Sequence, residues 1–295
     1  KSSTACRESS ISSLLEEIMI DKILENYIEQ TTKNYDEVAL LLSGGVDSMS
    51  IGFSAHRLQK KVTAYSFKTD QYDSYDYDKA EETAKIMGWG FVGITIPTKD
   101  IKDDFFRLLD MGCSKKTQFE CTYPFLYIYP SIQEKIVLSG ISADGWYGLS
   151  KKAMINYKRP KELFDKFRED YFQNENPAGV LQQLKLAEMY NKKFVHPYLW
   201  NDEISKFYMS KSWDELNKPK QKNVVREAFS VEFDKVGKVK NHLNLQLGSK
   251  IDKVFESLLD DYEINWKDRT RVMDVCRDWS KQRDYNEQNQ VSFNL

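Results

Sequence analysis

A serine, two glycines and an aspartate lie close together in the stretch SGGVDS, residues 43–48. Glycine has no Cβ, so a backbone with two adjacent glycines can turn sharply and approach a bulky anion. The hydroxyl groups of Ser43 and Ser48 can donate hydrogen bonds to such an anion. The carboxylate of Asp47 would repel a phosphate, but it suits Mg²⁺, which binds carboxylate and phosphate oxygens together. These residue types predict a site for a nucleotide's phosphate chain and its magnesium ion.

The surrounding residues indicate which elements hold this stretch. Residues 37–43, EVALLLS, form a short aliphatic run that is typical of a strand buried on both faces of a parallel sheet. Residues 48–60 have a helical pattern. A helix that follows a parallel strand directs its N-terminal N–H groups and positive dipole end to the carboxyl edge of the sheet, where an oxyanion binds. The alternative is a glycine turn that only connects strand and helix.

Strand and helix patterns alternate through the first half of the chain. We expect strands at 61–69, 90–97 and 134–140, and helices at 11–35, 76–88 and 102–112. This order predicts an α/β fold with a doubly wound, mostly parallel sheet.

The strand signals fade after residue 150. Helical patterns follow at 160–172, 178–194 and 252–264. We therefore expect a nucleotide-binding α/β region over residues 1–150 and a mainly helical region over residues 151–295 that completes the site. Residues 1–10 and about 280–295 are expected to be loose ends.

The composition disfavours several other classes of protein. The chain has 43 basic and 45 acidic residues among 295, so it lacks the positive excess of most nucleic-acid binders. No apolar run approaches the roughly 20 residues of a membrane span, and the N-terminus lacks the apolar core of a secretory signal. The four cysteines include no CxxC pair, which disfavours structural zinc. We expect a cytoplasmic protein with free thiols and without a membrane or nucleic-acid partner.

Residues 42–48, LSGGVDS, resemble the pyrophosphate loop of the PP-loop ATP pyrophosphatase superfamily, which has the adenine nucleotide alpha hydrolase-like fold. The spacing differs from the Walker loop and from GxGxxG. Members of this superfamily cleave ATP between the α and β phosphates and adenylate a carboxyl or carbonyl oxygen. A nitrogen or sulfur nucleophile then displaces AMP. The resemblance implies ATP and Mg²⁺ as cofactors.

A second stretch, residues 137–152, is similar to the asparagine synthetase signature LSG-x-G-[AS]-D-E-x-x-G-G. It follows a predicted strand, so Asp144 is expected in the same crevice as Asp47, where the two carboxylates would hold Mg²⁺. A surface turn with a solvated aspartate is the alternative. The resemblance to the family implies these nucleotide-binding residues: Leu42, Ser43, Gly44, Gly45, Asp47, Ser48, Phe67, Ser139 and Gly140.

A third stretch, residues 218–249, resembles the family pattern K-x-x-[LI]-R-E-[AC]-[FY] followed by a lysine in a loop. Lys222 and Lys240 fall on positions that reach the phosphates in this family, which implies a catalytic role. A compact ammonium charge suits a pyrophosphate that gains charge as its bond breaks. A solvated lysine-rich face is the alternative. Residues 193–210 are similar to another family segment, and we expect them to pack rather than react.

Taken in order, the motifs identify the chain as similar to the synthetase domain of asparagine synthetase and of β-lactam synthetase. This implies an AMP-forming amide ligase that joins a small-molecule or peptide carboxylate to ammonia or an amine. The glutaminase half of such enzymes is not expected here, so a separate protein that supplies the amine is a possible partner.

Three positions depart from the family pattern. Ile141 replaces a glutamate that in the family helps to deliver or deprotonate the nitrogen nucleophile, Ser142 replaces a glycine, and Gly145 replaces an acid. We expect intact adenylation, an altered acceptor half and a product other than plain asparagine, with a bulkier and less charged acceptor. The aromatic segment 119–130 would line the acyl substrate or pack the core, and segment 69–78 would be a mobile loop over the ATP site or a solvated connection.

Two other functions are compatible with a PP-loop. A PP-loop enzyme that modifies nucleic acid is one, although sulfur-transferring members usually carry paired cysteines. A non-catalytic nucleotide-binding protein is the other. The loss of the glutamate at position 141 favours it, and the presence of Ser43, Asp47, Asp144 and Lys240 argues against it.

Overall fold

The structure is a computed structural model that describes residues 19–158, 160–240 and 245–258, together with a few residues between 274 and 281. The predicted loose segment 1–10 and nearly all of the segment 280–295 lie outside these residues. The same holds for much of the helix predicted at 252–264.

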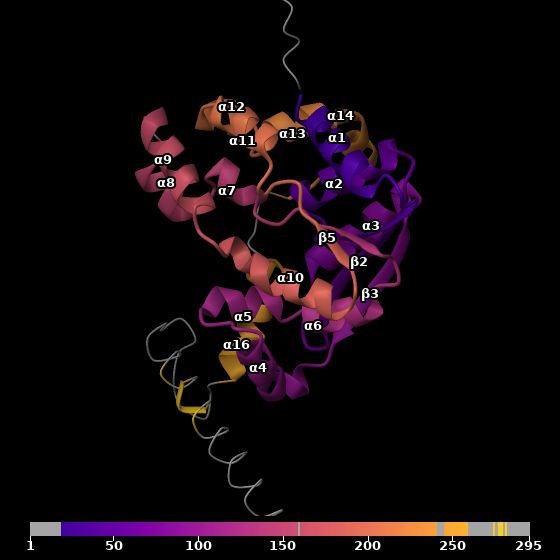
Figure 1. The fold of residues 1–295 in the computed structure, drawn as a ribbon, viewed down its shortest axis with the longest axis vertical. Coiled ribbons are helices and arrows are strands. Elements are labelled where there is room, and N and C mark those ends of the chain that lie inside the picture. Colours follow the sequence, from indigo (N-terminus) through magenta and orange to yellow (C-terminus); the bar gives the residue numbers. More distant parts are fainter. Residues whose placement is uncertain are drawn as a thin grey trace, which may run out of the picture.

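Five parallel strands form one sheet in the order β3–β2–β1–β4–β5 (Figure 1). The chain winds outward from β1 to β3 on one side and then from β4 to β5 on the other, so β1 and β4 meet at the topological switch point, where α/β folds bind ligands. This confirms the doubly wound parallel fold. The strand bounds are β1 Glu37–Leu41, β2 Lys61–Thr69, β3 Gly90–Ile96, β4 Ile136–Leu138 and β5 Lys193–Val195.

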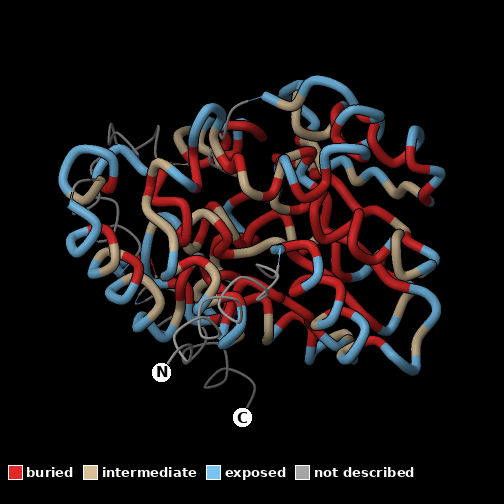
Figure 2. The backbone as a smooth tube through the Cα atoms, turned by 90° about the horizontal axis from the view of Figure 1, so that it is seen from above, coloured by how far each residue is buried: buried red, intermediate tan, exposed pale blue. Residues whose placement is uncertain are grey.

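Alternate residues of each strand point to opposite faces, and each face has its own apolar core. Leu40 packs in the core of one face, whereas Ala39 and Leu41 pack in the core of the other. The buried backbone of these layers runs through the middle of the molecule (Figure 2).

One set of helices contributes buried residues to the core around Leu40, and the first three of them were predicted from the helical pattern of the sequence. The helices on this face are α1 Ile20–Thr32, α2 Val46–Arg57, α3 Tyr75–Met87, α7 Ala143–Tyr147, α9 Lys161–Phe172, α11 Asp202–Met209, α12 Trp213–Asn217, α13 Asn223–Ala228 and α14 Ser230–Val236.

The core around Leu41 is covered by a second set of helices, which lies on the other side of the sheet in Figure 1. These helices are α4 Ile101–Asp110, α5 Lys116–Thr122, α6 Phe125–Ile128, α10 Val180–Met189 and α16 Ile251–Ser257. The remaining helices are α8 Lys151–Asn156, α15 Leu245–Gly248 and the short 3₁₀ segments η1 Thr98–Asp100, η2 Tyr129–Ser131 and η3 Pro177–Gly179.

One strand differs from the sequence-based expectation. A single helix was predicted over 178–194, but α10 ends at Met189 and the chain then forms β5, which pairs in parallel with β4. Pairing with β4 places Phe194 and Val195 among the buried residues. Tertiary pairing therefore overrides the helical pattern at this point. In the described part of the chain, no helix has both the length and the apolar character needed to cross a membrane.

Candidate active site

The glycine turn joins β1 to α2 at the switch point. Gly45 is the N-cap of α2, and Gly44 has a φ of +67°, a left-handed conformation that favours glycine. A Cβ on Gly44 would lie 2.8 Å from the carbonyl oxygen of Asp76 and 2.9 Å from Cβ of Lys79. Gly44 was predicted to let the backbone approach a phosphate, and it is also required because it packs against the first turns of α3.

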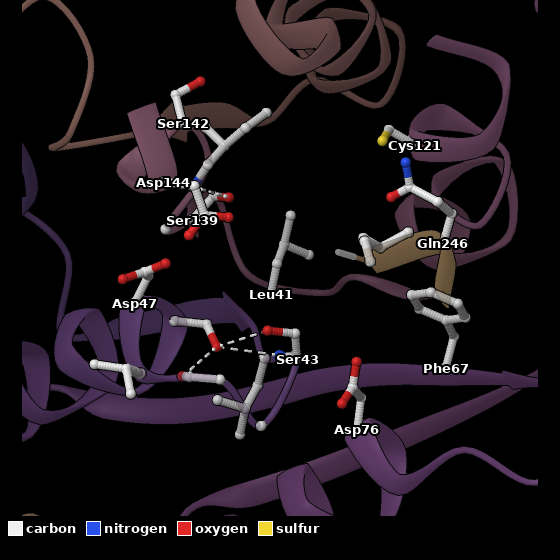
Figure 3. A pocket seen from close by; sticks show the side chains of 18 of the residues that line it. Leu41, Ser43, Asp47, Phe67, Asp76, Cys121, Ser139, Ser142, Asp144 and Gln246 are labelled. Atoms are coloured by element: carbon white, nitrogen blue, oxygen red, sulfur yellow. Dashed lines mark hydrogen bonds between the residues drawn. The ribbon is translucent and has the colours of Figure 1, made fainter. Parts of the chain in front are cut away.

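The two serines of the turn hold its shape. The N–H of Ser43 donates to Oγ of Ser48 at 3.2 Å, and the two hydroxyl oxygens are 3.1 Å apart (Figure 3). Oγ of Ser48 also donates to the carbonyl oxygen of Gly45 at 3.1 Å. The turn is therefore preorganised at the N-terminus of a helix of 12 residues, with backbone N–H donors available to an anion.

Lys222 connects the two aspartates that the sequence placed in one crevice. Its Nζ is 2.5 Å from Oδ2 of Asp47 and 2.6 Å from Oδ1 of Asp144. Lys222 is the N-cap of α13, and its backbone N–H donates to Oδ1 of Asn217, whose Nδ2 donates to the carbonyl oxygen of Tyr147. The lysine is thus anchored at both ends in a buried position.

Burial dominates the electrostatics of this cluster. It raises the pKa of Asp47 to about 7, although the positive charge of Lys222 acts in the opposite direction. Burial also tends to lower the pKa of Lys222, but the carboxylates of Asp144 and Asp47 outweigh it, so that pKa is raised. The lysine therefore stays charged while Asp47 titrates in the neutral range.

Asp47 and Asp144 fit a magnesium ion. Both carboxylates already reach one cation, the ammonium group of Lys222. The other oxygen of Asp47, Oδ1, is buried and has no hydrogen-bond partner among the described residues. The described residues contain no cluster of three metal-ligating side chains. Two carboxylates suit Mg²⁺ that takes its remaining ligands from nucleotide phosphates and water.

All twelve sequence-predicted site residues line one cavity of about 520 Å³ at the carboxyl edge of the sheet. The structure thus brings together the phosphate turn, the loop after β4 and both lysines. Figure 3 shows Asp47, Ser139 and Asp144 on one side of this cavity and Phe67 on the other. The twelve residues are Leu42, Ser43, Gly44, Gly45, Asp47, Ser48, Phe67, Ser139, Gly140, Asp144, Lys222 and Lys240.

Lys240 lies beside the start of α3, which packs against the glycine turn of residues 43–48 (called the phosphate turn below). Its Nζ is 3.5 Å from the centre of the Tyr75 ring, and its charge acts on Asp76. Burial raises the pKa of Asp76 to about 6, against the influence of Lys240. Tyr75 and Asp76 belong to segment 69–78 and line the cavity, so this part of the segment is the start of a helix at the site rather than a solvated connection.

Sequence reasoning missed several residues of the cavity. Arg226 lies in the third stretch, residues 218–249, and no role was predicted for it. It lines the cavity, and the negative charge of Asp47 acts on it. Gln183 on α10 also lines the cavity, and no motif signalled it.

The aromatic segment 119–130 packs into the core, as one of the two alternatives predicted, and also reaches the cavity. Phe119, Tyr123 and Tyr129 are fully buried in the core on the Leu41 face. Phe125 and Ile128 line the cavity.

The departures from the family pattern lie at the same cavity. Ile141 and Ser142 line it. A Cβ on Gly145 would lie 2.4 Å from the ring of Tyr171, another lining residue, so this ring occupies the space that a side chain at position 145 would need. His196, in the segment predicted to pack, is buried and is not among the residues that line the cavity, and burial lowers its pKa.

Comparisons with known proteins show what this chain resembles. The family model described as "Asparagine synthase" matches residues 19–233, and no curated protein sequence matches the chain significantly. Among solved structures, NMN synthetase from Francisella tularensis is 17% identical over 76% of this chain and 97% of that chain, with a TM-score of 0.34.

Two further solved structures are similar at the same level. The NH3-dependent NAD synthetase from Campylobacter jejuni is 16% identical over 76% of this chain and 97% of that chain, with a TM-score of 0.32. A predicted subunit of tRNA methyltransferase from Methanocaldococcus jannaschii is 16% identical over 66% of this chain and 87% of that chain, with a TM-score of 0.33. The assignment rests on the family model, which spans most of the chain: this protein belongs to the asparagine synthase family.

Proposed function

We propose that this protein is an ATP-dependent amide ligase that forms AMP and pyrophosphate. A carboxylate oxygen of the acid attacks the α-phosphorus of ATP, and the bond to the β-phosphate breaks, which yields an acyl adenylate and pyrophosphate. The nitrogen of ammonia or an amine then attacks the acyl carbon. The bond to AMP breaks, AMP leaves with its electron pair, and the nitrogen releases a proton to solvent.

The observation that carries this proposal is the contact of one buried lysine, Lys222, with two carboxylates beside the glycine turn. We expect a departing pyrophosphate to gain charge beside this ammonium group, and fixed charges of this kind stabilise a transition state without reorganisation. Lys240 supplies a second cation on the other flank of the turn. Mg²⁺, when held by Asp47 and Asp144, supplies neutralisation of phosphate charge.

Groups of the protein itself would orient the phosphates of ATP and the reacting carboxylate. The backbone N–H groups at the start of α2 would bind the phosphates, and the Ser43–Ser48 pair keeps the turn in the required shape. Ser139 and Gly140, at the end of β4, would border the activated carboxylate. A Cβ at Gly140 would lie 2.8 Å from the carbonyl carbon of Asp47, so a larger residue there would displace the start of α2.

The test is to incubate the protein with ATP, Mg²⁺ and panels of carboxylic acids and amines, and to measure AMP and pyrophosphate. We expect both products in equal amounts, and we expect Asp47→Asn to reduce them at least ~100-fold while circular dichroism shows a retained fold. Protein that binds ATP but forms AMP with no acid would instead be a nucleotide-binding protein without turnover. Copurifying tRNA or DNA that becomes adenylated would indicate the nucleic-acid alternative.

A further inference from the structure

The charged residues that line the cavity lie on one side of the sheet. Each belongs to, or follows, a helix that packs on the Leu40 core: Asp47, Asp76, Asp144, Lys222, Arg226 and Lys240. Helices α5, α6 and α10, which cover the Leu41 core, contribute no charged residue to the described lining. Because α2 begins at the phosphate turn and packs on the Leu40 core, we expect the pyrophosphate end of ATP on this charged side of the cavity.

Arg226 lies beside the helix that begins at the phosphate turn. It follows Lys222 by one turn of α13, and the charge of Asp47 acts on it. The carbon of its guanidinium group lies 5.6 Å from the centre of the Phe233 ring, and that ring packs edge-on against Phe53 of α2 with the ring centres 5.2 Å apart. These contacts place Arg226 on the charged side of the cavity.

The guanidinium group of Arg226 has unused donors. Of its five N–H groups, only the one on Nε has an acceptor among the described residues, the carbonyl oxygen of Gln221 at 3.0 Å. The two Nη groups have no acceptor there, and neither atom is fully buried. Arg57 differs, because its Nε and both Nη groups donate to acceptors that include Glu232 and Asp21. Hydrogen bonding to Glu232 raises the pKa of Arg57, whereas burial lowers the pKa of Arg226.

Two free Nη groups form a fork that matches two oxygens of one anion, and phosphate and carboxylate both have this geometry. The position beside α2 favours phosphate, since the reacting carboxylate is expected at the end of β4. Lys222 cannot replace such a fork, because its ammonium group already contacts Asp47 and Asp144 and has three N–H groups in all.

We propose that Arg226 binds two oxygens of the pyrophosphate end of ATP through its Nη groups and holds the pyrophosphate as it departs, while Lys222 fixes the two carboxylates beside it. The inference rests on the proposed function, since it concerns the leaving group of that reaction.

Calorimetry with inorganic pyrophosphate and with AMP, each in the presence of Mg²⁺, tests this inference. Pyrophosphate has the groups that Arg226 would contact, whereas AMP has only the α-phosphate. We expect Arg226→Met to weaken the binding of pyrophosphate about 30-fold, as the loss of charged hydrogen bonds allows. The affinity for AMP should not change.

Two further variants identify the cause. Arg226→Lys keeps the charge but loses the fork, so we expect it to weaken pyrophosphate binding about fivefold and AMP binding not at all. This variant carries the test if circular dichroism shows that Arg226→Met does not fold. Arg57→Met removes a guanidinium group that does not line the cavity, and it should change neither affinity.

Unchanged pyrophosphate affinity in the Arg226 variants would overturn the inference, as would equal losses for pyrophosphate and AMP or no binding of pyrophosphate by the original protein. These results would leave the proposed function standing if AMP still forms from ATP with some acid. The expected binding pattern without AMP formation would instead overturn the function and leave Arg226 as a pyrophosphate-binding residue.

Discussion

Lys222 and Asp144 are 78 positions apart in the sequence, yet Nζ of the lysine lies 2.6 Å from Oδ1 of the aspartate. The same ammonium group contacts Asp47 at the start of α2. One cation from α13 therefore compensates two carboxylates that come from the ends of β1 and β4. We expect this contact to support both the stability of the fold and the proposed chemistry, and the two effects can be measured separately.

Replacing Lys222 by Met keeps most of the side-chain volume but removes the charge. We expect the free energy of unfolding at pH 8 to fall by about 3 kcal/mol, because an uncompensated carboxylate remains at a largely buried position. Urea titration measures this loss. AMP formation should fall at least ~100-fold, since the charge that stabilises the departing pyrophosphate is gone.

Lys218→Met is the matched control for this variant. Nζ of Lys218 is 2.6 Å from Oδ2 of Asp214, but the two side chains are 56% and 47% exposed. An exposed pair contributes at most about 0.5 kcal/mol. Equal losses of stability in the two variants would contradict the role assigned to the buried lysine.

The raised pKa of Asp47, about 7, gives stability a defined dependence on pH. An unfolded aspartate titrates near pH 3.9, so between about pH 4 and 7 the folded protein retains a proton that the unfolded chain has released. The contribution of Asp47 to the free energy of unfolding therefore falls as the pH rises through this window, by up to about 1.4 kcal/mol per pH unit, and is constant above it.

Asp47→Asn tests this, because asparagine resembles the protonated acid and does not titrate. Urea titrations from pH 4.5 to 8 should show the variant gaining stability relative to the original protein as the pH rises, with no further gain above pH 7.5. Parallel curves across the range would show that Asp47 does not titrate as its burial implies.

The fold was largely predictable because buried parallel strands have a distinct pattern. Strand patterns predicted β1, β2, β3 and β4, and the helix predicted over 76–88 has Gly88 at its C-cap, with a φ of +71°. β5 was missed because three residues beginning with Lys193 carry no period, and only pairing with β4 makes them a strand.

The site was predictable as far as motifs reach. The motifs in the glycine turn and in the loop after β4 predicted that Asp47 and Asp144 belong to the site. Nothing in the spacing of the sequence indicated that Lys222 contacts both of them. The position of Gln183 at the cavity was not predictable, since one glutamine on a helix has no sequence signature.

Gly145→Ala tests why no acid occupies this position. In the middle of a helix, alanine is normally more stable than glycine by about 1 kcal/mol. Here a Cβ would lie 2.4 Å from the Tyr171 ring, so we expect the free energy of unfolding to fall instead, by about 1–3 kcal/mol. Thermal or urea unfolding shows whether the variant gains or loses free energy of unfolding. In the double variant with Tyr171→Ala, the alanine at 145 should no longer be destabilising, and full additivity would exclude this steric cause.

Arg57 separates stability from catalysis, because it joins three helices without lining the cavity. Its guanidinium group donates to Glu232 at 2.6 and 2.8 Å and to Asp21 at 2.8 Å, which links α2 to α14 and α1. Arg57→Met leaves these partly buried acids uncompensated, so we expect a loss of about 2–3 kcal/mol in the free energy of unfolding. The affinity for ATP, measured by calorimetry well below the unfolding temperature, should not change. Lys61→Met, which breaks a solvent-exposed pair with Glu37, should leave the free energy of unfolding unchanged within error. A large loss of ATP affinity in Arg57→Met would show that the packing of these helices also sets the geometry of the phosphate turn.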